Sequence, residues 1–193
     1  MVSLTYFVAS SIDGRIAGPD GDFGAFPVVG DHIDMLAEDW TDTLPGAALD
    51  ALGRTAPNDR FDTVVMGWRT YAAGFPYGVH DPYPHLRQVV FTHDPQRPVG
   101  GSPGGVEFTD AEPVDVVRRL KADSPVGVWL CGGGDLAGQL ADEIDVLVVK
   151  VNPIVLGDGI SLFAGLPYDP RTWILGDSTS YASGVVVNQY VRR

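Results

Sequence analysis

Residues 126–140, VGVWLCGGGDLAGQL, decide how this chain folds, because an apolar run of β-type meets three consecutive glycines. After the glycines, Leu136, Leu140 and Ile144 follow the spacing of a helix, so the stretch predicts a strand, a glycine turn and a helix. Such a turn aims the first amides of the helix at the space above the strand, and glycine lets the backbone approach a ligand closely. A phosphate group is the ligand that this geometry favours. The alternative is a tight turn that binds nothing.

Size and composition indicate one globular domain over residues 1–193. With 45% hydrophobic residues the chain can bury one sizeable core. Its formal net charge of −12 disfavours nucleic acid and anionic membranes as partners. The amino-terminal residues lack a basic secretory region, no apolar run approaches membrane-spanning length, and the one cysteine, Cys131, has no disulfide partner. We therefore expect a cytoplasmic protein.

Apolar runs of β-type alternate with helical patterns along the chain. Beyond the opening stretch, strands are expected at residues 3–10, 61–67, 88–92, 106–109, 145–151, 172–175 and 184–190. Helices are expected at 31–40, with Asp31 as a plausible N-cap, at 47–52 and at 114–122, where Arg118, Arg119 and Lys121 face solvent. Residues 72–86 have the composition of a surface loop, and 97–105 that of a mobile loop. This order predicts an α/β fold whose sheet is mostly parallel and ends in an antiparallel hairpin.

The sequence lacks the residues that several kinds of catalytic and metal-binding site require. The four histidines are scattered, and no His or Cys cluster has metal-ligand spacing, so no metal site is expected. No Walker motif and no G-x-S-x-G elbow occur. Cys131, at a strand end, is expected to be a small buried hydrophobe and not a nucleophile.

The glycine turn also fits the G-x-G-x-x-A spacing of a dinucleotide fingerprint, through Gly132, Gly134 and Ala137. However, the next strand, 145–151, is followed by no acidic residue for a ribose, and the motif lies two thirds of the way along the chain. An ordinary Rossmann fold is therefore disfavoured. The glycines still favour a phosphate-bearing ligand that is held in another way.

Taken together, the motifs resemble the dihydrofolate-reductase-like superfamily, and most closely the reductase domain of the bacterial bifunctional deaminase-reductase of riboflavin biosynthesis and its stand-alone relatives. The matching blocks occur in family order over nearly the whole chain: residues 8–17 (VASSIDGRIA), 66–71 (MGWRTY), 90–93 (VFTH), 131–136 (CGGGDL), 142–145 (DEID) and 153–163 (PIVLGDGISLF). The last block is the most specific. The resemblance implies a three-layer fold with flanking helices and a nicotinamide cofactor, NADPH, bound in extended form across the strand ends.

The resemblance also implies a set of cofactor-binding residues. Ala9 and Ile16 would meet the nicotinamide, and Gly67, Arg69 and Thr70 would meet phosphates. Thr92 and His93 would lie near the adenine ribose and its 2′-phosphate. The pyrophosphate and the nicotinamide ribose would contact Gly132, Gly133, Gly134, Asp135 and Leu136. Arg69 is independently a reasonable phosphate ligand, because it follows a strand-ending glycine at a helix start.

Two departures from the family pattern concern the cofactor. Trp68 stands where family members often carry a basic residue, and His93 stands near the position of an arginine. A histidine is a weaker, pH-dependent partner for a 2′-phosphate, so NADH stays open as an alternative cofactor, and nearby Arg97 is a substitute cation. The H-x-E and P-C-x-x-C motifs of the deaminase half do not occur in this sequence.

Two carboxylates are candidates for a catalytic role. Asp31, with Asp34 one turn later as a second choice, is the candidate that dihydrofolate reductase suggests, and its alternative role is a helix cap. Asp13 lies beside the expected nicotinamide site, and a turn before Gly14 is its alternative role.

The leading substrate is the riboflavin-pathway pyrimidine, and a pteridine or another small carbonyl or imine compound is the rival substrate. A nucleotide-binding module without catalysis is the third interpretation. The acidic loop at Asp20 and Asp22 would repel a substrate phosphate. A homodimer is also expected, from the resemblance and from the apolar β surface of residues 146–156.

Overall fold

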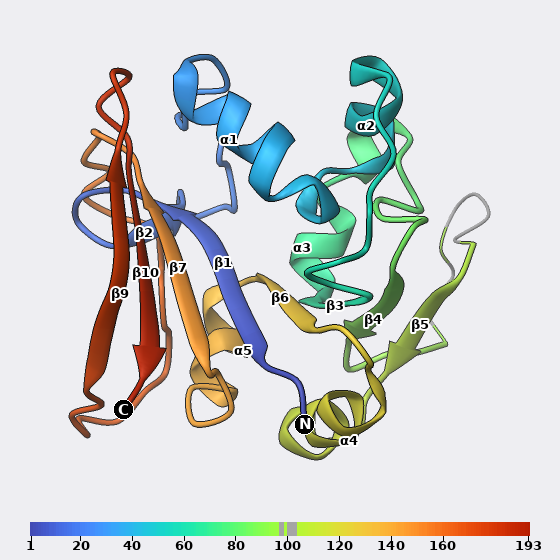
Figure 1. Cartoon of the computed structure of the whole chain (residues 1–193). Helices are drawn as coiled ribbons and strands as arrows, with labels where there is room; N and C mark the ends of the chain where they lie inside the picture. The colour runs from blue at the N-terminus through green and yellow to red at the C-terminus, as the bar shows by residue number, and fades with distance from the viewer. Residues whose placement is uncertain (97–98, 100–103) are drawn as a thin grey trace.

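A single eight-stranded sheet forms the middle of the molecule (Figure 1). The structure is a computed structural model that describes residues 1–96, 99 and 104–193. The strand order is β5-β4-β3-β6-β1-β7-β10-β9; the first six run parallel, whereas β10 is antiparallel to both of its neighbours. The expected α/β fold with an antiparallel carboxyl-terminal hairpin is thus confirmed. The strands of this sheet are β1 (Leu4–Ser10), β3 (Thr63–Gly67), β4 (Arg87–Phe91), β5 (Val106–Thr109), β6 (Val128–Gly132), β7 (Val146–Val151), β9 (Trp173–Ser180) and β10 (Val186–Arg192).

Helices cover both faces of the sheet and complete three layers (Figure 1). On one face, α4 and α5 contribute buried residues such as Val117 and Leu136 to one core cluster. On the other face, Met35 of α1 and Tyr71 of α3 belong to a second core cluster, which Phe7 and Trp129 of the sheet complete. The helices are α1 (Asp31–Asp39), α2 (Gly46–Leu52), α3 (Trp68–Ala72), α4 (Pro113–Asp123) and α5 (Gly134–Gln139), with 3-10 turns η1 (Thr41–Thr43) and η2 (Phe75–Tyr77).

The composition of each strand follows from its place in the sheet. The residues Thr63–Met66 of β3 are all buried, because a parallel strand with helices on both faces needs apolar side chains on both sides. β9 has only one neighbour, and its second half, residues 176–180, reads GDSTS and is exposed. An edge strand with polar side chains does not invite pairing with another chain.

Several boundaries and details differ from the expectation. Asp31 is not the N-cap of α1: Gly30 occupies that position, and no side chain caps the helix. β9 extends to Ser180, beyond the expected 172–175, because it pairs with β10 along its length. Two short strands, β2 (Arg15–Ala17) and β8 (Ile160–Ser161), were not expected and pair with each other. The expected mobile loop at 97–105 lies mostly outside the described residues.

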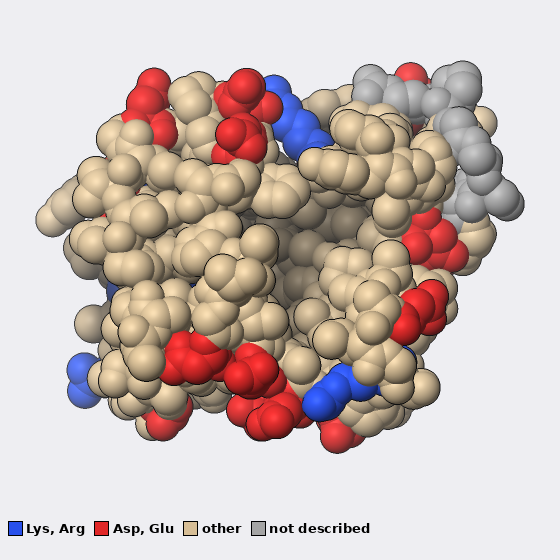
Figure 2. Space-filling model, turned by 90° about the horizontal axis from the view of Figure 1, so that it is seen from above, with Lys and Arg blue, Asp and Glu red and all other residues tan. Residues whose placement is uncertain are grey.

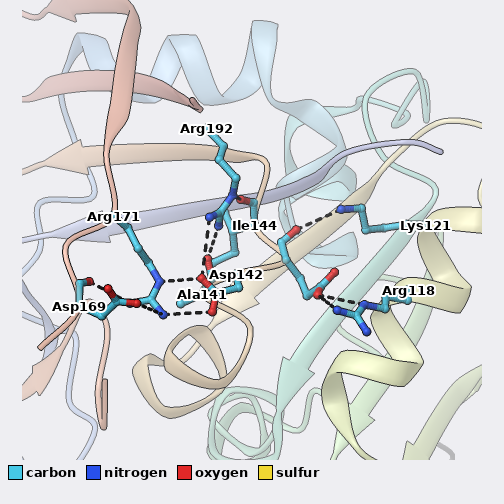
Figure 3. Close-up of polar contacts among 9 residues, drawn as sticks. Arg118, Lys121, Ala141, Asp142, Ile144, Asp169, Arg171 and Arg192 are labelled. Carbon is cyan, nitrogen blue, oxygen red and sulfur yellow. Dashed lines mark hydrogen bonds and ion pairs between the residues drawn. The ribbon is translucent and has the colours of Figure 1, made fainter. Parts of the chain in front are cut away.

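Ion pairs and carbonyl contacts tie the lower end of the sheet together (Figure 3). Arg171 pairs with Asp142 at 2.7 Å, and Arg192 donates to the carbonyl oxygens of Ile144 and Ala141. Lys121 was expected to face solvent, but only 11% of its side chain is exposed, and its ammonium lies 2.6 Å from Asp145. This network fixes the turn before β7. It lies at the end of the sheet that carries both chain termini, opposite α1 and α2 (Figure 1).

The apolar surface that motivated the expectation of a homodimer is largely used within one chain. β7 lies between β1 and β10, and Leu147, Val148 and Val149 are buried in the core. Large apolar side chains that are exposed include Val155, within the expected stretch, and Ile174 and Leu175 of β9. The β7 part of the expected surface therefore does not support a dimer, whereas the dimer itself stays a prediction.

Candidate functional site

The residues expected to bind a cofactor lie along one edge of the sheet. In a parallel sheet the carboxyl ends of all strands share an edge, and the neighbouring strands β4, β3, β6 and β1 place Thr92, Gly67, Gly132 and Ala9 there in that order. With strands about 4.8 Å apart, these four positions span roughly 14 Å. Figure 2, which looks down on this end of the molecule, shows a hollow whose walls are mostly neither acidic nor basic, with acidic and basic side chains farther out around it.

The first glycine turn leads from β3 into α3. Gly67 is the last residue of β3 and the N-cap of α3, with extended backbone angles, and no side chain caps the helix. Arg69 is exposed and forms no hydrogen bond or ion pair among the described residues, and the next residue, Thr70, is partly buried. A cation, a hydroxyl group and the start of a helix without a side-chain cap thus share one short turn.

The second glycine turn leads from β6 into α5. Gly132 has φ of +133°, a conformation that L side chains rarely adopt, so only glycine fits there without strain. The peptide bond between Gly132 and Gly133 is cis. Gly133 is the N-cap of α5 and again has no side-chain cap. Of the residues beyond it, Asp135 is exposed, whereas the side chain of Leu136 is buried in the core, so only the backbone of Leu136 can reach a ligand.

The two turns meet each other. Met66, one residue before Gly67, is paired with Gly132 across the β3–β6 ladder. A Cβ atom placed on Gly132 would lie 3.9 Å from the hydroxyl oxygen of Thr70, and one placed on Gly133 would lie 3.7 Å from it. Beyond the chain neighbours, no other described atom lies within 4 Å of either position. The side chain of Thr70 and the backbone at Gly133 therefore line the same space, and we call this space the double-turn cradle, formed by residues 67–70 and 132–134.

Gly134 serves a different purpose from its two predecessors. A Cβ atom placed there would overlap the carbonyl oxygen of Ser161, and one on Gly138 would overlap that of Ala164. These glycines admit the backbone of the same chain, not a ligand. The three glycines were expected to bind a ligand together, but in the structure Gly134 is a packing position.

The segment that packs on Gly134, residues 153–164, is called the strap here. It carries the block PIVLGDGISLF. Its ends are fixed by backbone hydrogen bonds: Ile12 donates to Ile154, and Ala164 donates to Gly134. In its middle, the guanidinium of Arg15 donates to the hydroxyl oxygen of Ser161 at 2.7 Å. The strap therefore connects the turn after β1 with the double-turn cradle, which sequence reasoning did not predict. Arg15, within the matched block at 8–17, was the available signal.

Asp13 holds the turn after β1 against the strap. Its carboxylate accepts hydrogen bonds from the hydroxyl group of Ser11 at 2.6 Å and from the amides of Leu156 and Gly157 at 3.1 and 2.8 Å. The Ser11 bond and then the Leu156 bond lower the pKa of Asp13 from 3.8 to about 2. Ala9 and Ile16, the residues expected at the nicotinamide, lie in β1 and β2 on either side of this turn.

Asp31 connects α1 to the tip of the β9–β10 hairpin. Its carboxylate accepts the amides of Ala182 and Ser183 at 2.7 and 3.0 Å. Partial desolvation raises the pKa of Asp31, but these hydrogen bonds outweigh it and hold the pKa below its usual value. The neighbouring His32 is fully buried, and its Nδ1 atom lies 3.0 Å from the hydroxyl oxygen of Ser183. Both candidate carboxylates are thus ionised at neutral pH and occupied by the fold; a role of either in a reaction stays a prediction.

The remaining candidates lie beside β4. Thr92 is buried and its hydroxyl oxygen accepts the amide of Asp94, whereas His93 is exposed. Arg97, the expected substitute cation, lies outside the described residues. Cys131 is half-buried, not fully buried as expected, and desolvation raises the pKa of its thiol to about 11, which disfavours a nucleophile. In residues 1–96, 99 and 104–193 no group of three His, Cys, Asp or Glu is placed to hold a metal ion, and no helix is long and apolar enough to cross a membrane.

Comparison with known proteins identifies the family. The model of the RibD C-terminal domain matches residues 2–187. YwjB of Bacillus subtilis (strain 168), an uncharacterised protein, is 28% identical over 191 residues, which cover 96% of this chain and 95% of YwjB.

Solved structures share the fold. A protein of Shewanella sp. PV-4 assigned to riboflavin biosynthesis superposes with a TM-score of 0.71 at 22% identity and is covered over 99% of its length. The diaminohydroxyphosphoribosylaminopyrimidine deaminase/5-amino-6-(5-phosphoribosylamino)uracil reductase of Thermotoga maritima gives 0.68 at 15% identity, and RibD of Acinetobacter baumannii gives 0.68 at 17%. This chain is covered completely in all three, but it spans only 57% and 58% of the Thermotoga and Acinetobacter proteins.

Proposed function

The chain belongs to the RibD C-terminal domain family, and from that premise we propose that it is a reductase that uses NADPH to reduce a small molecule. The leading substrate is 5-amino-6-(5-phosphoribosylamino)uracil, which the name of the Thermotoga relative gives for its reductase activity. The motifs of a deaminase half do not occur in this sequence, so only the reduction is proposed.

The observation that carries the proposal is the double-turn cradle. Two turns that each leave helix amides without a side-chain cap lie side by side, with Thr70 facing Gly132 and Gly133. Both helices are short, with five and six residues. The individual amides and Arg69 would therefore contribute more to anion binding than a helix dipole would. Two neighbouring turns that can each bind an anion suit a ligand with more than one phosphate. A dinucleotide is such a ligand.

The proposal gives the remaining residues the roles that the family resemblance implies. In this proposal Gly67, Arg69 and Thr70 bind phosphate oxygens, and Gly132 to Leu136 bind the pyrophosphate and the adjoining ribose through backbone amides. Thr92 and His93, beside β4, lie toward the adenine ribose, and Ala9 and Ile16 lie toward the nicotinamide. When bound, the cofactor supplies hydride. The strap would orient the nicotinamide end, because it holds the turn after β1 through Asp13.

The acidic loop between β2 and α1 favours a second substrate class. Its residues Asp20 and Asp22 would repel a substrate phosphate. An unphosphorylated pteridine or another small carbonyl or imine compound is therefore the alternative substrate.

A homodimer is also proposed, with the exposed apolar residues Ile174 and Leu175 in its interface. A monomer in sedimentation at micromolar concentration would argue against it.

Thermal unfolding with NADPH and, separately, with NADH at millimolar concentration tests the cofactor, because a specific ligand raises the melting temperature by mass action. No shift with either would overturn the proposal. Oxidation of NADPH, followed optically with the pyrimidine and with dihydrofolate, then separates the two substrates. A shift without turnover of either compound, or of a panel of small carbonyl and imine compounds, would identify a nucleotide-binding module.

A further inference from the structure

Reduction of a C=O or C=N bond requires a proton as well as a hydride, and the two carboxylates considered for this role are poorly suited to it. Asp13 accepts three hydrogen bonds and Asp31 two, all within the fold. Each bond stabilises the ionised form, and an acid that is already ionised at neutral pH has no proton to give. A different group is needed if the proposed reductase function holds.

Lys150 lies where such a group would have to be. In β7, Val146 and Val148 belong to the core cluster under α1, whereas Leu147 and Val149 belong to the cluster on the opposite face. Because side chains alternate along a strand, Lys150 lies on the α1 face. It is registered with Ala9 of β1 on one side and with Val187 of β10 on the other. Lys150 is thus the neighbour of Ala9, the residue expected at the nicotinamide.

The surroundings of Lys150 lack a partner for its charge. The chain has two lysines, and the other, Lys121, is paired with Asp145 at 2.6 Å. Within the described residues the ammonium group of Lys150 forms no hydrogen bond or ion pair, although its side chain is partly buried. Burial lowers its pKa, and no neighbouring charge counteracts this. The titratable residues on this side of the sheet are Arg15, Asp31, His32, Asp34, Glu38, Asp39, Asp177 of β9 and Tyr181 of the β9–β10 turn.

We propose that Lys150 is the catalytic proton donor of the reductase and contacts the heteroatom of the substrate. The substrate carbon accepts the hydride that the dihydronicotinamide supplies, and the oxygen or nitrogen accepts a proton from the ammonium of Lys150. The π bond breaks, a C–H bond and an O–H or N–H bond form, and the neutral amine regains a proton from solvent. A lysine without an acidic partner keeps its proton available for transfer, and partial burial brings its pKa closer to neutral, where a general acid is most effective.

Competitive acetylation tests this inference without a substrate. The protein is treated with a trace of acetic anhydride from pH 6 to 11, and the labelling of Lys150 and Lys121 is followed by mass spectrometry. We expect Lys150 to reach half of its maximal labelling at a lower pH than Lys121, and NADP⁺ to slow its labelling while leaving Lys121 unchanged. Equal or higher half-labelling pH for Lys150, or labelling of Lys150 that NADP⁺ does not affect, would overturn the inference.

Variants then separate this inference from the proposed function. Lys150→Met and Lys150→Arg should keep the NADPH-dependent thermal shift but lose about 10²- to 10⁴-fold in turnover, since arginine keeps the charge but does not release its proton. Lys121→Arg, the matched control, should keep full turnover. If wild type binds NADPH and Lys150→Met turns over within about threefold of it, only the role of Lys150 fails. If wild type binds neither NADPH nor NADH, the proposed function fails, and this inference fails with it.

Discussion

The hydroxyl oxygen of Thr70 lies 3.7 Å from the position that a Cβ atom of Gly133 would occupy, although the two residues belong to different strand–turn–helix units. The relationship arises because β3 and β6 are neighbours in the sheet, so that their carboxyl ends place two turns together. One ligand can therefore contact both turns, which is what distinguishes a cradle from a pair of ordinary connections.

Gly133→Ala should remove cofactor binding without unfolding the protein. The backbone at Gly133 is extended and the new methyl group would make only an ordinary contact with Thr70, so the melting temperature of the free protein should change by less than about 2 °C. The methyl group would occupy the space of a phosphate, and the NADPH-induced thermal shift should disappear. Gly105→Ala, at a position with nothing within 4 Å of a Cβ atom, is the matched control and should keep the shift.

Gly134→Ala, in contrast, should destabilise the free protein. Its methyl group would overlap the carbonyl oxygen of Ser161 in the strap, and neither backbone can move independently. Overpacking of this kind costs about 1–3 kcal/mol, which corresponds to a fall in melting temperature of roughly 3–10 °C for a chain of this size. Calorimetry measures the effect. A melting temperature equal to that of Gly133→Ala would mean that the strap does not pack on Gly134 in solution.

Arg69→Ala should weaken NADPH binding by about tenfold. A charge-assisted hydrogen bond to phosphate contributes about 1.5–3 kcal/mol, and exposure of Arg69 to solvent places its effect at the lower end. Titration calorimetry at low and high salt measures the affinity, and the variant should show a weaker salt dependence than wild type. Arg119→Ala, which removes an exposed arginine from α4 on the other face of the sheet, should leave both values unchanged.

Asp13→Asn should flatten the acid part of the stability profile. The pKa of Asp13 is about 2 in the folded protein and 3.8 without its partners, so the ionised side chain stabilises the fold above pH 4, and this contribution is lost as the pH falls toward 2. Urea unfolding from pH 2 to 6 should therefore show a shallower loss for the variant than for wild type. Asp50→Asn, at an exposed position of α2, should follow the wild-type profile. If Asp13→Asn follows it too, Asp13 does not hold the strap.

Much of the fold could be predicted because its local signals are strong. Continuous apolar runs such as 63–66 are typical of parallel strands buried on both faces, and the predicted strands lie within a few residues of the observed ones. The ends were less predictable: β9 reaches Ser180 because β10 pairs with it, not because its own residues favour a strand. Asp31 was placed at the start of α1, but its bonds to Ala182 and Ser183 depend on a hairpin about 150 residues away.

Most strands and helices, the family resemblance and the places where glycine turns follow strands can be recognised in the amino-acid sequence, since they depend on residue periodicity and on short motifs. Which strands are neighbours is visible only in the folded molecule. That arrangement joins Thr70 to Gly133 in one cradle, assigns Gly134 to the packing of the strap, and places Lys150 beside Ala9. The physical reason is that the function of a glycine or a lysine depends on what occupies the space next to it, and that space is filled by residues distant in the chain.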